Sequence, residues 1–357
     1  ADLSSVYVQM KLSVIDPELV EETVPNISRF ANSQNRISEA DFFASHPFHL
    51  EMERISRRVF APPRDGNLSQ TRWFYERARG QFKDAMAYLT AGARNRFQLQ
   101  HPKDQVIVKT DVSKYELTFE CKPFLVCQGA QKAFLSFAKD LSNRWEDDAS
   151  KLGEGYFKDL IARAIVFRWT DKMVMTSDWY KVERGYKAQI VTYTIARLVK
   201  HLMQEKSAVL DLRKIWNEQS VPDPLAASLQ KIAPEVARVI KDAPESIRNI
   251  SEYAKREICW KMMLDEVDVS LSSGLEGYLM GVEDLARARR DDRVTQKIDQ
   301  EIDLDIILLD LVPKAEEIRE MSDRHKLLSP ANTRALEKLR VGNVILNRRE
   351  KNAMKHL

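Results

Sequence analysis

Apolar and polar residues alternate along the start of the chain, which is the pattern of a strand with one buried face. The apolar members of this alternation are Val6, Val8, Met10, Leu12 and Val14. A single strand leaves its backbone N–H and C=O groups without partners, and the best later candidate for a strand is the short segment Gln105–Lys109. We therefore expect the first strand to pair with sequence that lies upstream in a longer protein.

From about residue 47 onwards, apolar residues recur every three or four positions, which is the spacing of amphipathic helices. A helix is predicted to begin near Pro47, because a proline costs little in the first helical turn. Its apolar stripe consists of Phe48, Met52, Ile55 and Val59. The same spacing predicts helices after Gly129, after Gly155, and over residues 190–198, 225–239 and 244–260. The sequence thus predicts a mainly α-helical, multi-layered fold with a small β element near the N-terminus, and we interpret the aromatic residues of the stripes as core.

The composition of the chain changes after Met263. Residues 268–274 are small and polar, which is typical of a linker or loop, and charge-dense helices are predicted over residues 283–305, 313–326 and 330–357. We therefore divide the chain into a core region, residues 1–264, and a charged helical C-terminal extension, residues 265–357. Acidic residues interrupt the arginine cluster at 287–293, which favours a self-paired solvated face over a nucleic-acid stripe.

Composition and motifs exclude several classes of protein. The chain has 357 residues, 44% of them hydrophobic and 31% charged, with a net charge of +3. These values are ordinary for a soluble protein, and no apolar run reaches the roughly 18 residues of a membrane helix. Cys121, Cys127 and Cys259 are odd in number and lack zinc spacing, so we expect reduced, mostly buried thiols in a cytoplasmic protein. Neither a metal site nor a cofactor is expected, since the sequence contains no HExxH pair, P-loop or dinucleotide fingerprint.

Two segments are richer in polar side chains than core packing requires. The first contains Asn32, Gln34 and Asn35, with Arg36 beside them. Each amide offers two donor hydrogens and one acceptor oxygen, so the segment fits a loop that recognises base edges, phosphates or another polar ligand. The alternative is a loop whose amides satisfy its own backbone groups.

The second segment, Trp73–Gln81, places aromatic residues among charged ones. If the segment is helical, Glu76 lies one helical turn from both Arg72 and Arg79. Two guanidinium groups would then hold the Glu76 carboxylate in its ionised form. Such a carboxylate is a poor general acid, but it can hold the two arginine side chains in position.

Other side chains of this second segment are then available to a ligand. Arg77 fits a bidentate contact to phosphate or carboxylate, and Trp73 and Tyr75 fit stacking on a base. The alternative is a buried ion-pair network that fixes this segment against the amide-rich loop.

Both segments resemble the AIPR family, the abortive-infection phage-resistance proteins of bacteria and archaea. The family pattern N-S-Q-N-x-[IV]-x-x-x-D stands here as Asn32–Asp41, and the pattern F-Y-E-R-[KA]-R-G-Q stands as Phe74–Gln81. Shorter matches extend the resemblance from about Val6 to Met263. The resemblance implies a bacterial, cytoplasmic role in defence against phage. Family members usually carry several hundred further residues upstream, including an N-G-x-Q-T motif that does not occur here, so the missing N-terminal part is an expected partner.

Three functions follow as hypotheses. The first is a nucleic-acid-recognising or regulatory module that contacts DNA or RNA through Asn32, Gln34, Asn35, Arg36, Trp73, Tyr75, Arg77 and Arg79. The second is a metal-dependent nuclease-type effector with Glu76 and Asp41 in its active site, which we rank lower because both residues have structural interpretations. The third is an oligomerisation or sensor scaffold that binds a phage protein. A homo-oligomer is a further expected assembly, and a membrane is not an expected partner.

Overall fold

The computed structural model of the protein describes residues 15–16, 19, 23, 43–64, 70–182, 184–244, 249–325, 328–342 and 346–354. The strand predicted at residues 6–14 and the segment Asn32–Asp41 lie outside this part of the chain. The chain divides into two compact units, Ala1–Asp284 and Leu285–Leu357. The predicted limit between residues 264 and 265 falls inside the first unit and stays a prediction.

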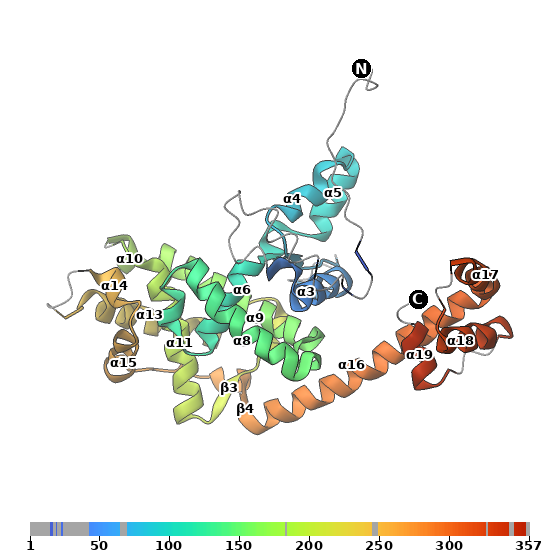
Figure 1. The fold of residues 1–357 in the computed structure, drawn as a ribbon. Coiled ribbons are helices and arrows are strands. Elements are labelled where there is room, and N and C mark those ends of the chain that lie inside the picture. Colours follow the sequence, from blue (N-terminus) through green and yellow to red (C-terminus); the bar gives the residue numbers. More distant parts are fainter. Residues whose placement is uncertain are drawn as a thin grey trace, which may run out of the picture. The chain divides into compact units, whose positions relative to one another are not determined.

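The described chain is mainly α-helical with small sheets, which confirms the predicted fold class (Figure 1). The helices of the first unit are α3 (Pro47–Arg58), α4 (Gln81–Ala87), α5 (Ala91–Gln100), α6 (Lys109–Phe119), α7 (Pro123–Val126), α8 (Ala130–Asp148), α9 (Glu154–Thr176), α10 (Asp178–Val182), α11 (Lys187–Glu205), α12 (Leu212–Glu218), α13 (Asp223–Lys241), α14 (Ile250–Tyr253) and α15 (Glu257–Glu266). Short 3-10 turns lie at η2 (Phe43–Ser45), η3 (Lys103–Gln105), η4 (Ala149–Leu152) and η5 (Leu275–Tyr278). The strands are β1 (Phe74–Glu76), β2 (Val106–Val108), β3 (Ala208–Leu210) and β4 (Leu279–Gly281).

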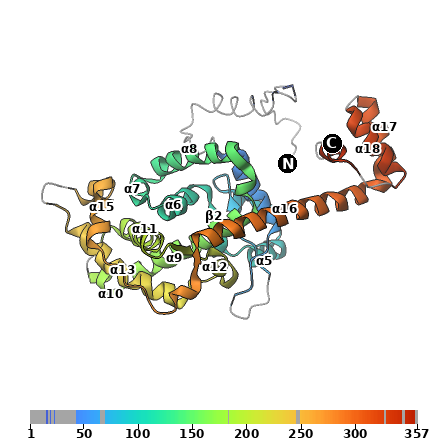
Figure 2. The same cartoon turned by 90° about the horizontal axis from the view of Figure 1, so that it is seen from below.

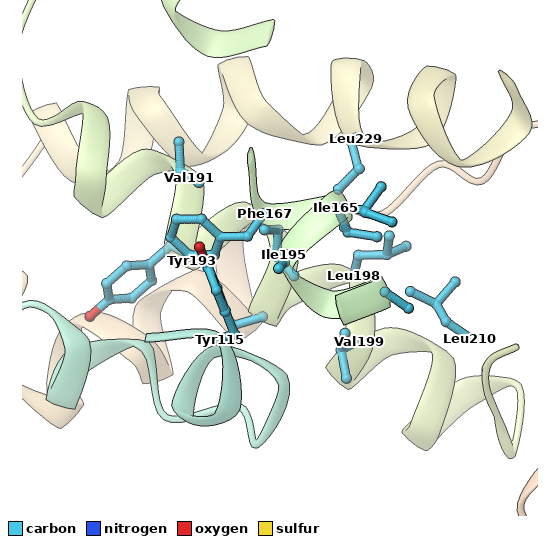
Figure 3. Packing of buried hydrophobic residues seen from close by; sticks show 14 of the residues in the cluster. Tyr115, Ile165, Phe167, Val191, Tyr193, Ile195, Leu198, Val199, Leu210 and Leu229 are labelled. Atoms are coloured by element: carbon cyan, nitrogen blue, oxygen red, sulfur yellow. The ribbon is translucent and has the colours of Figure 1, made fainter. Parts of the chain in front are cut away.

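Long helices build the centre of the first unit. Helices α6, α9 and α11 contact one another, α8 packs on α6, and α13 packs on α11 (Figures 1 and 2). Because helices cover α9 and α11 on several sides, each buries residues on most of its faces. Figure 3 shows this packing at Tyr115, Phe167, Tyr193 and Leu229, which come from α6, α9, α11 and α13. All four side chains are buried, and two of them, Tyr193 and Leu229, lie in the helices predicted over residues 190–198 and 225–239.

Helix α3, which carries part of the site described below, begins at Pro47 as predicted. The ring nitrogen Nδ1 of His46 accepts a hydrogen bond from the backbone N–H of Phe48 at 3.2 Å and so caps the helix. Proline needs no such partner at this position. The stripe is confirmed at Phe48, Met52 and Ile55, which are fully buried.

The strand predicted within Gln105–Lys109 is confirmed as β2. It pairs in parallel with β1, so that Tyr75 lies opposite Ile107 and Glu76 lies opposite Val108. Strands β3 and β4 form a second, antiparallel pair.

The single helix predicted over Pro244–Trp260 is wrong, because the structure places two short helices there, α14 and α15, with a turn between them. Residues 245–248 lie outside the described part. In the turn, the carbonyl oxygen of Ala254 accepts a hydrogen bond from the Tyr193 hydroxyl at 2.8 Å. A tertiary contact from α11 therefore takes a carbonyl group that a continuous helix would have used internally.

The second unit contains most of α16 (Val282–Leu311), followed by η6 (Val312–Lys314), α17 (Ala315–His325), α18 (Pro330–Arg340) and α19 (Arg348–Met354). The helices predicted over residues 283–305 and 313–326 are confirmed as α16 and α17, whereas the single helix predicted over residues 330–357 is wrong, because α18 ends at Arg340 and α19 begins at Arg348. Their apolar residues form a small core of their own, made of Leu304, Leu308, Ala315, Ala335, Leu336, Leu339, Leu346 and Met354. Helix α18 starts with a capping box between Ser329 and Asn332. Within the described ranges, no helix combines the length and the apolar character needed to cross a membrane.

Candidate functional site

The segment Trp73–Gln81 is not helical, which corrects the helix considered for it. It forms strand β1, a turn and the first residue of α4. Because neighbouring strand residues point to opposite faces, Phe74 packs against Phe82 while Tyr75 reaches His49 on the other side. The parallel pairing with β2 satisfies backbone groups of the strand.

Glu76 fastens the turn between β1 and α4. Its carboxylate accepts hydrogen bonds from the backbone N–H groups of Gly80, at 3.0 Å, and Phe82, at 3.3 Å. These groups lie at the start of α4, where backbone donors lack helical partners and a negative charge is stabilising. The predicted pairs with Arg72 and Arg79 do not form in the described structure, since a strand and a turn do not bring these residues one helical turn from Glu76. Glu76 therefore has a structural contact, but its hydrogen-bond partners are backbone N–H groups rather than the predicted arginines.

Arg77 is tied to α3 through Glu53. Its Nε donates to Glu53 Oε2 at 2.7 Å, and its Nη1 donates to the carbonyl oxygen of Ala44 at 2.9 Å. The same Glu53 carboxylate also accepts hydrogen bonds from Gln81 Nε2 and, at 3.4 Å, from Arg57 Nη2. Two guanidinium groups thus share one carboxylate, and the cluster keeps a surplus of positive charge.

His49 and Tyr75 form a buried pair beside this cluster. Both side chains are fully buried, and His49 Nδ1 lies 2.6 Å from the hydroxyl oxygen of Tyr75. Burial, together with the positive charges of Lys109, His46 and Arg77, lowers the pKa of His49 to about 3. Burial also raises the pKa of Tyr75 well above its usual value. The imidazole is therefore neutral near pH 7, and its Nε2 has no hydrogen-bond partner among the residues that the structure describes.

The parallel sheet brings two basic residues to one edge. Because Glu76 and Val108 are paired at the ends of β1 and β2, the residues that follow them, Arg77 and Lys109, lie at the carboxyl ends of the two strands. Larger parallel sheets bind their ligands at this edge. Lys109 is buried there at 3% exposure, whereas the side chain of Arg77 is 25% exposed. Arg77 is therefore the more accessible of the two cations.

Glu53, His49 and Lys109 also belong to this cluster, although their positions in the sequence did not predict it. Lys109 directly follows the short apolar segment Val106–Val108 and looks like an ordinary polar residue at the end of a strand. Glu53 lies on the charged face of a helix and looks like any solvated residue. Only the fold shows that Arg77 and Gln81 donate hydrogen bonds to it.

Both aromatic residues that were predicted to stack on a base are core residues instead. Trp73 is 1% exposed and Tyr75 is 0% exposed. The indole N–H of Trp73 donates to Gln219 Oε1 at 2.9 Å, and Gln219 Nε2 donates in turn to the carbonyl oxygen of Trp216 at 2.5 Å. A ring without an exposed face has no surface on which a base can stack, so packing replaces the predicted ligand contact.

The amide-rich segment is not part of this geometry. Asn32, Gln34, Asn35, Arg36 and Asp41 lie outside the described residues, and their predicted roles stay predictions. Of the other predicted site residues, the structure places Tyr75 and Arg77 at one end of β1, with Arg79 exposed in the turn that follows.

The cysteines carry free thiols. Burial raises the pKa of Cys121 and Cys259 to about 11 and that of Cys127 to about 12, so none of them is a thiolate near pH 7. In the part of the chain that the structure describes, no three His, Cys, Asp or Glu side chains are grouped in a way that could hold a metal ion.

The fold and the site together define a mainly helical protein in which a small parallel sheet and one helix hold a cluster of basic side chains. The family model described as AIPR protein matches residues 1–244, which is more than half of the chain. The chain belongs to the AIPR family, and this membership indicates a role in abortive-infection defence against phage. No curated protein and no solved structure matches the chain.

Proposed function

We propose that this chain is a nucleic-acid-recognising module of an abortive-infection protein, and that the turn carrying Arg77 and Arg79 contacts phosphate groups. The observation that supports the proposal most strongly is the hydrogen bonding of Arg77. Glu53 and Ala44 hold its Nε and Nη1, which fixes the guanidinium plane while a quarter of the side chain remains exposed.

A fixed guanidinium group binds phosphate well because it does not lose conformational freedom on binding. Its remaining N–H groups present a planar set of donors. Glu53 does not cancel the positive charge of the site, since Arg57 shares the same carboxylate. Arg79 adds a second, exposed cation two residues further on.

The test is a binding titration of the protein with labelled DNA and RNA oligonucleotides at a series of NaCl concentrations. We expect binding that weakens steeply with salt, because each phosphate contact releases counterions. Arg79→Gln is expected to lower the slope of log K against log salt by about 0.7 to 0.9. The matched control is Arg256→Gln, an exposed arginine in the turn before α15, which is expected to leave the slope unchanged.

Two results would overturn the proposal. Absence of binding at low salt would remove the phosphate contact altogether. Metal-dependent cleavage that is lost in Glu76→Gln would show instead that the segment is an active site.

A further inference from the structure

Helices α4 and α5 form a hairpin that contributes little to the core of the first unit (Figure 1). Helix α4 buries only Phe82, and α5 buries no residue. The two helices touch through Phe82 and Phe97, whose ring centroids lie 5.6 Å apart, and both rings rest on Phe74 of β1. Most other side chains of the hairpin therefore face outward.

The hairpin and the residues that flank it carry a net positive charge. Residues 79–103 contain five cations and one acid, which gives 5 − 1 = +4. The whole chain carries +3, so all remaining residues together carry 3 − 4 = −1. The five cations are Arg79, Lys83, Arg94, Arg96 and Lys103, and the acid is Asp84.

These cations are exposed and are not neutralised by neighbours. In the described structure none of the five forms an ion pair, and all are exposed. By contrast, the charged residues of α3 pair with one another, as Arg54 does with Glu51 at 2.7 Å. A cluster of exposed cations without ion-pair partners is the electrostatic footprint of a polyanion-binding surface.

An aromatic ring stands at the tip of the same hairpin. Tyr88, in the turn between α4 and α5, is 99% exposed, which is the highest exposure of any large hydrophobic side chain in the described chain. An exposed aromatic ring flanked by cations fits a stacking platform for unpaired bases.

We infer that the α4–α5 hairpin is a contact surface for single-stranded nucleic acid, with its cations on the phosphates and Tyr88 stacked on a base. The inference rests on the proposed function and deepens it, because it names the strand state of the ligand. Helix α4 begins directly after the turn that carries Arg77 and Arg79. The hairpin therefore adjoins the residues that we propose to contact phosphate. A duplex offers the same phosphates but no free base face to Tyr88, so a single strand is the better ligand.

The experiment measures fluorescence anisotropy of the full chain with a labelled 20-nucleotide dT strand, a 20-nucleotide U strand and a 20-base-pair duplex. Tyr88→Ala is expected to weaken single-strand binding about 5- to 150-fold, which corresponds to one stacked base. Tyr88→Phe keeps the ring and is expected to bind like the unmodified protein. The combined Lys83→Gln, Arg94→Gln, Arg96→Gln variant is expected to lower the salt slope by about 2 on single strands.

The charge control is the combined variant Lys132→Gln, Lys139→Gln, Arg256→Gln, which removes three exposed cations from other elements of the first unit. It is expected to leave the salt slope almost unchanged. All the changed side chains are exposed, and circular dichroism of each variant checks that the fold is retained.

The outcomes separate this inference from the proposed function. If the unmodified protein binds nucleic acid and the hairpin variants bind equally well, the hairpin is not the contact surface and the proposed function stands. Equal affinity for duplex and single strands, unaffected by Tyr88→Ala, overturns the stacking role. If Tyr88→Ala changes the oligomeric state rather than binding, the hairpin is a protein interface. Absence of all binding removes both proposals. The dT and U strands show whether DNA or RNA is preferred.

Discussion

Acid is expected to destabilise the first unit through His49. The folded protein holds this imidazole at a pKa of about 3, against 6.5 for an unperturbed histidine. Because the pKa of His49 is lower in the folded state than in the unfolded state, the unfolded chain binds a proton at His49 between pH 6.5 and pH 3, whereas the folded chain does not. Stability is therefore fully present above pH 6.5, is lost as the pH falls below 6.5, and stops falling near pH 3.

The magnitude at pH 5 depends mainly on the unfolded pKa. A pH of 5 lies 1.5 units below the pKa of 6.5 in the unfolded chain, whereas His49 of the folded protein is still neutral at this pH. Each unit is worth about 1.36 kcal/mol, so His49 removes about 2 kcal/mol of stability between pH 7 and pH 5. Complete burial of the ring justifies using the full value without a discount for solvent.

The assay is urea unfolding at pH 7 and pH 5, followed by tryptophan fluorescence. All six tryptophans lie in the first unit, so the signal reports that unit alone. His49→Gln retains a side chain that can hydrogen-bond to Tyr75 but does not titrate. Its loss of stability between the two pH values is expected to be smaller than that of the unmodified protein by about 2 kcal/mol.

His101→Gln serves as a graded comparison. Burial lowers the pKa of His101 as well, so the same sign and a smaller effect are expected. Equal losses between pH 7 and pH 5 in the His49→Gln variant and the unmodified protein would refute the reasoning, because a neutral buried imidazole is its only premise.

Three further changes test other contacts, with stability again measured by urea unfolding. Trp73→Phe leaves Gln219 Oε1 without its indole donor at 2.9 Å, and a loss of about 1 to 3 kcal/mol is expected; no loss would show that the hydrogen bond is replaced. Glu116→Ala leaves the buried guanidinium of Arg163 without its carboxylate, with an expected loss of about 3 to 5 kcal/mol; a value near zero would indicate that the pair is solvated. Gly80→Ala would place its Cβ 3.8 Å from Asp84 Oδ2, an ordinary contact, but must keep φ at +86°, which is expected to cost about 1 kcal/mol from backbone strain; a stabilised variant would contradict this conformation.

The helices and the family could be predicted from the sequence because each depends on residues that lie close together in the chain. An apolar stripe such as Phe48, Met52 and Ile55 reflects hydrogen bonds four residues apart, and Pro47 marks the start of the helix by its own covalent geometry. The motif Phe74–Gln81 likewise identified the family without any knowledge of its conformation.

The conformation and the roles within that motif were decided only by tertiary structure. Phe74–Glu76 is a strand because β2, about thirty residues further along the chain, pairs with it. Arg77 is held by Glu53, which lies 24 residues earlier, and Tyr75 reaches His49 across 26 residues. Spacing rules describe neighbours within one helix or strand, whereas these partners meet because two separate elements pack together. The sequence by itself therefore determined that Phe74–Gln81 marks this protein. The fold decided that Tyr75, Glu76 and Arg77 make contacts within the site, whereas Arg79 and the cations of the adjoining hairpin are exposed.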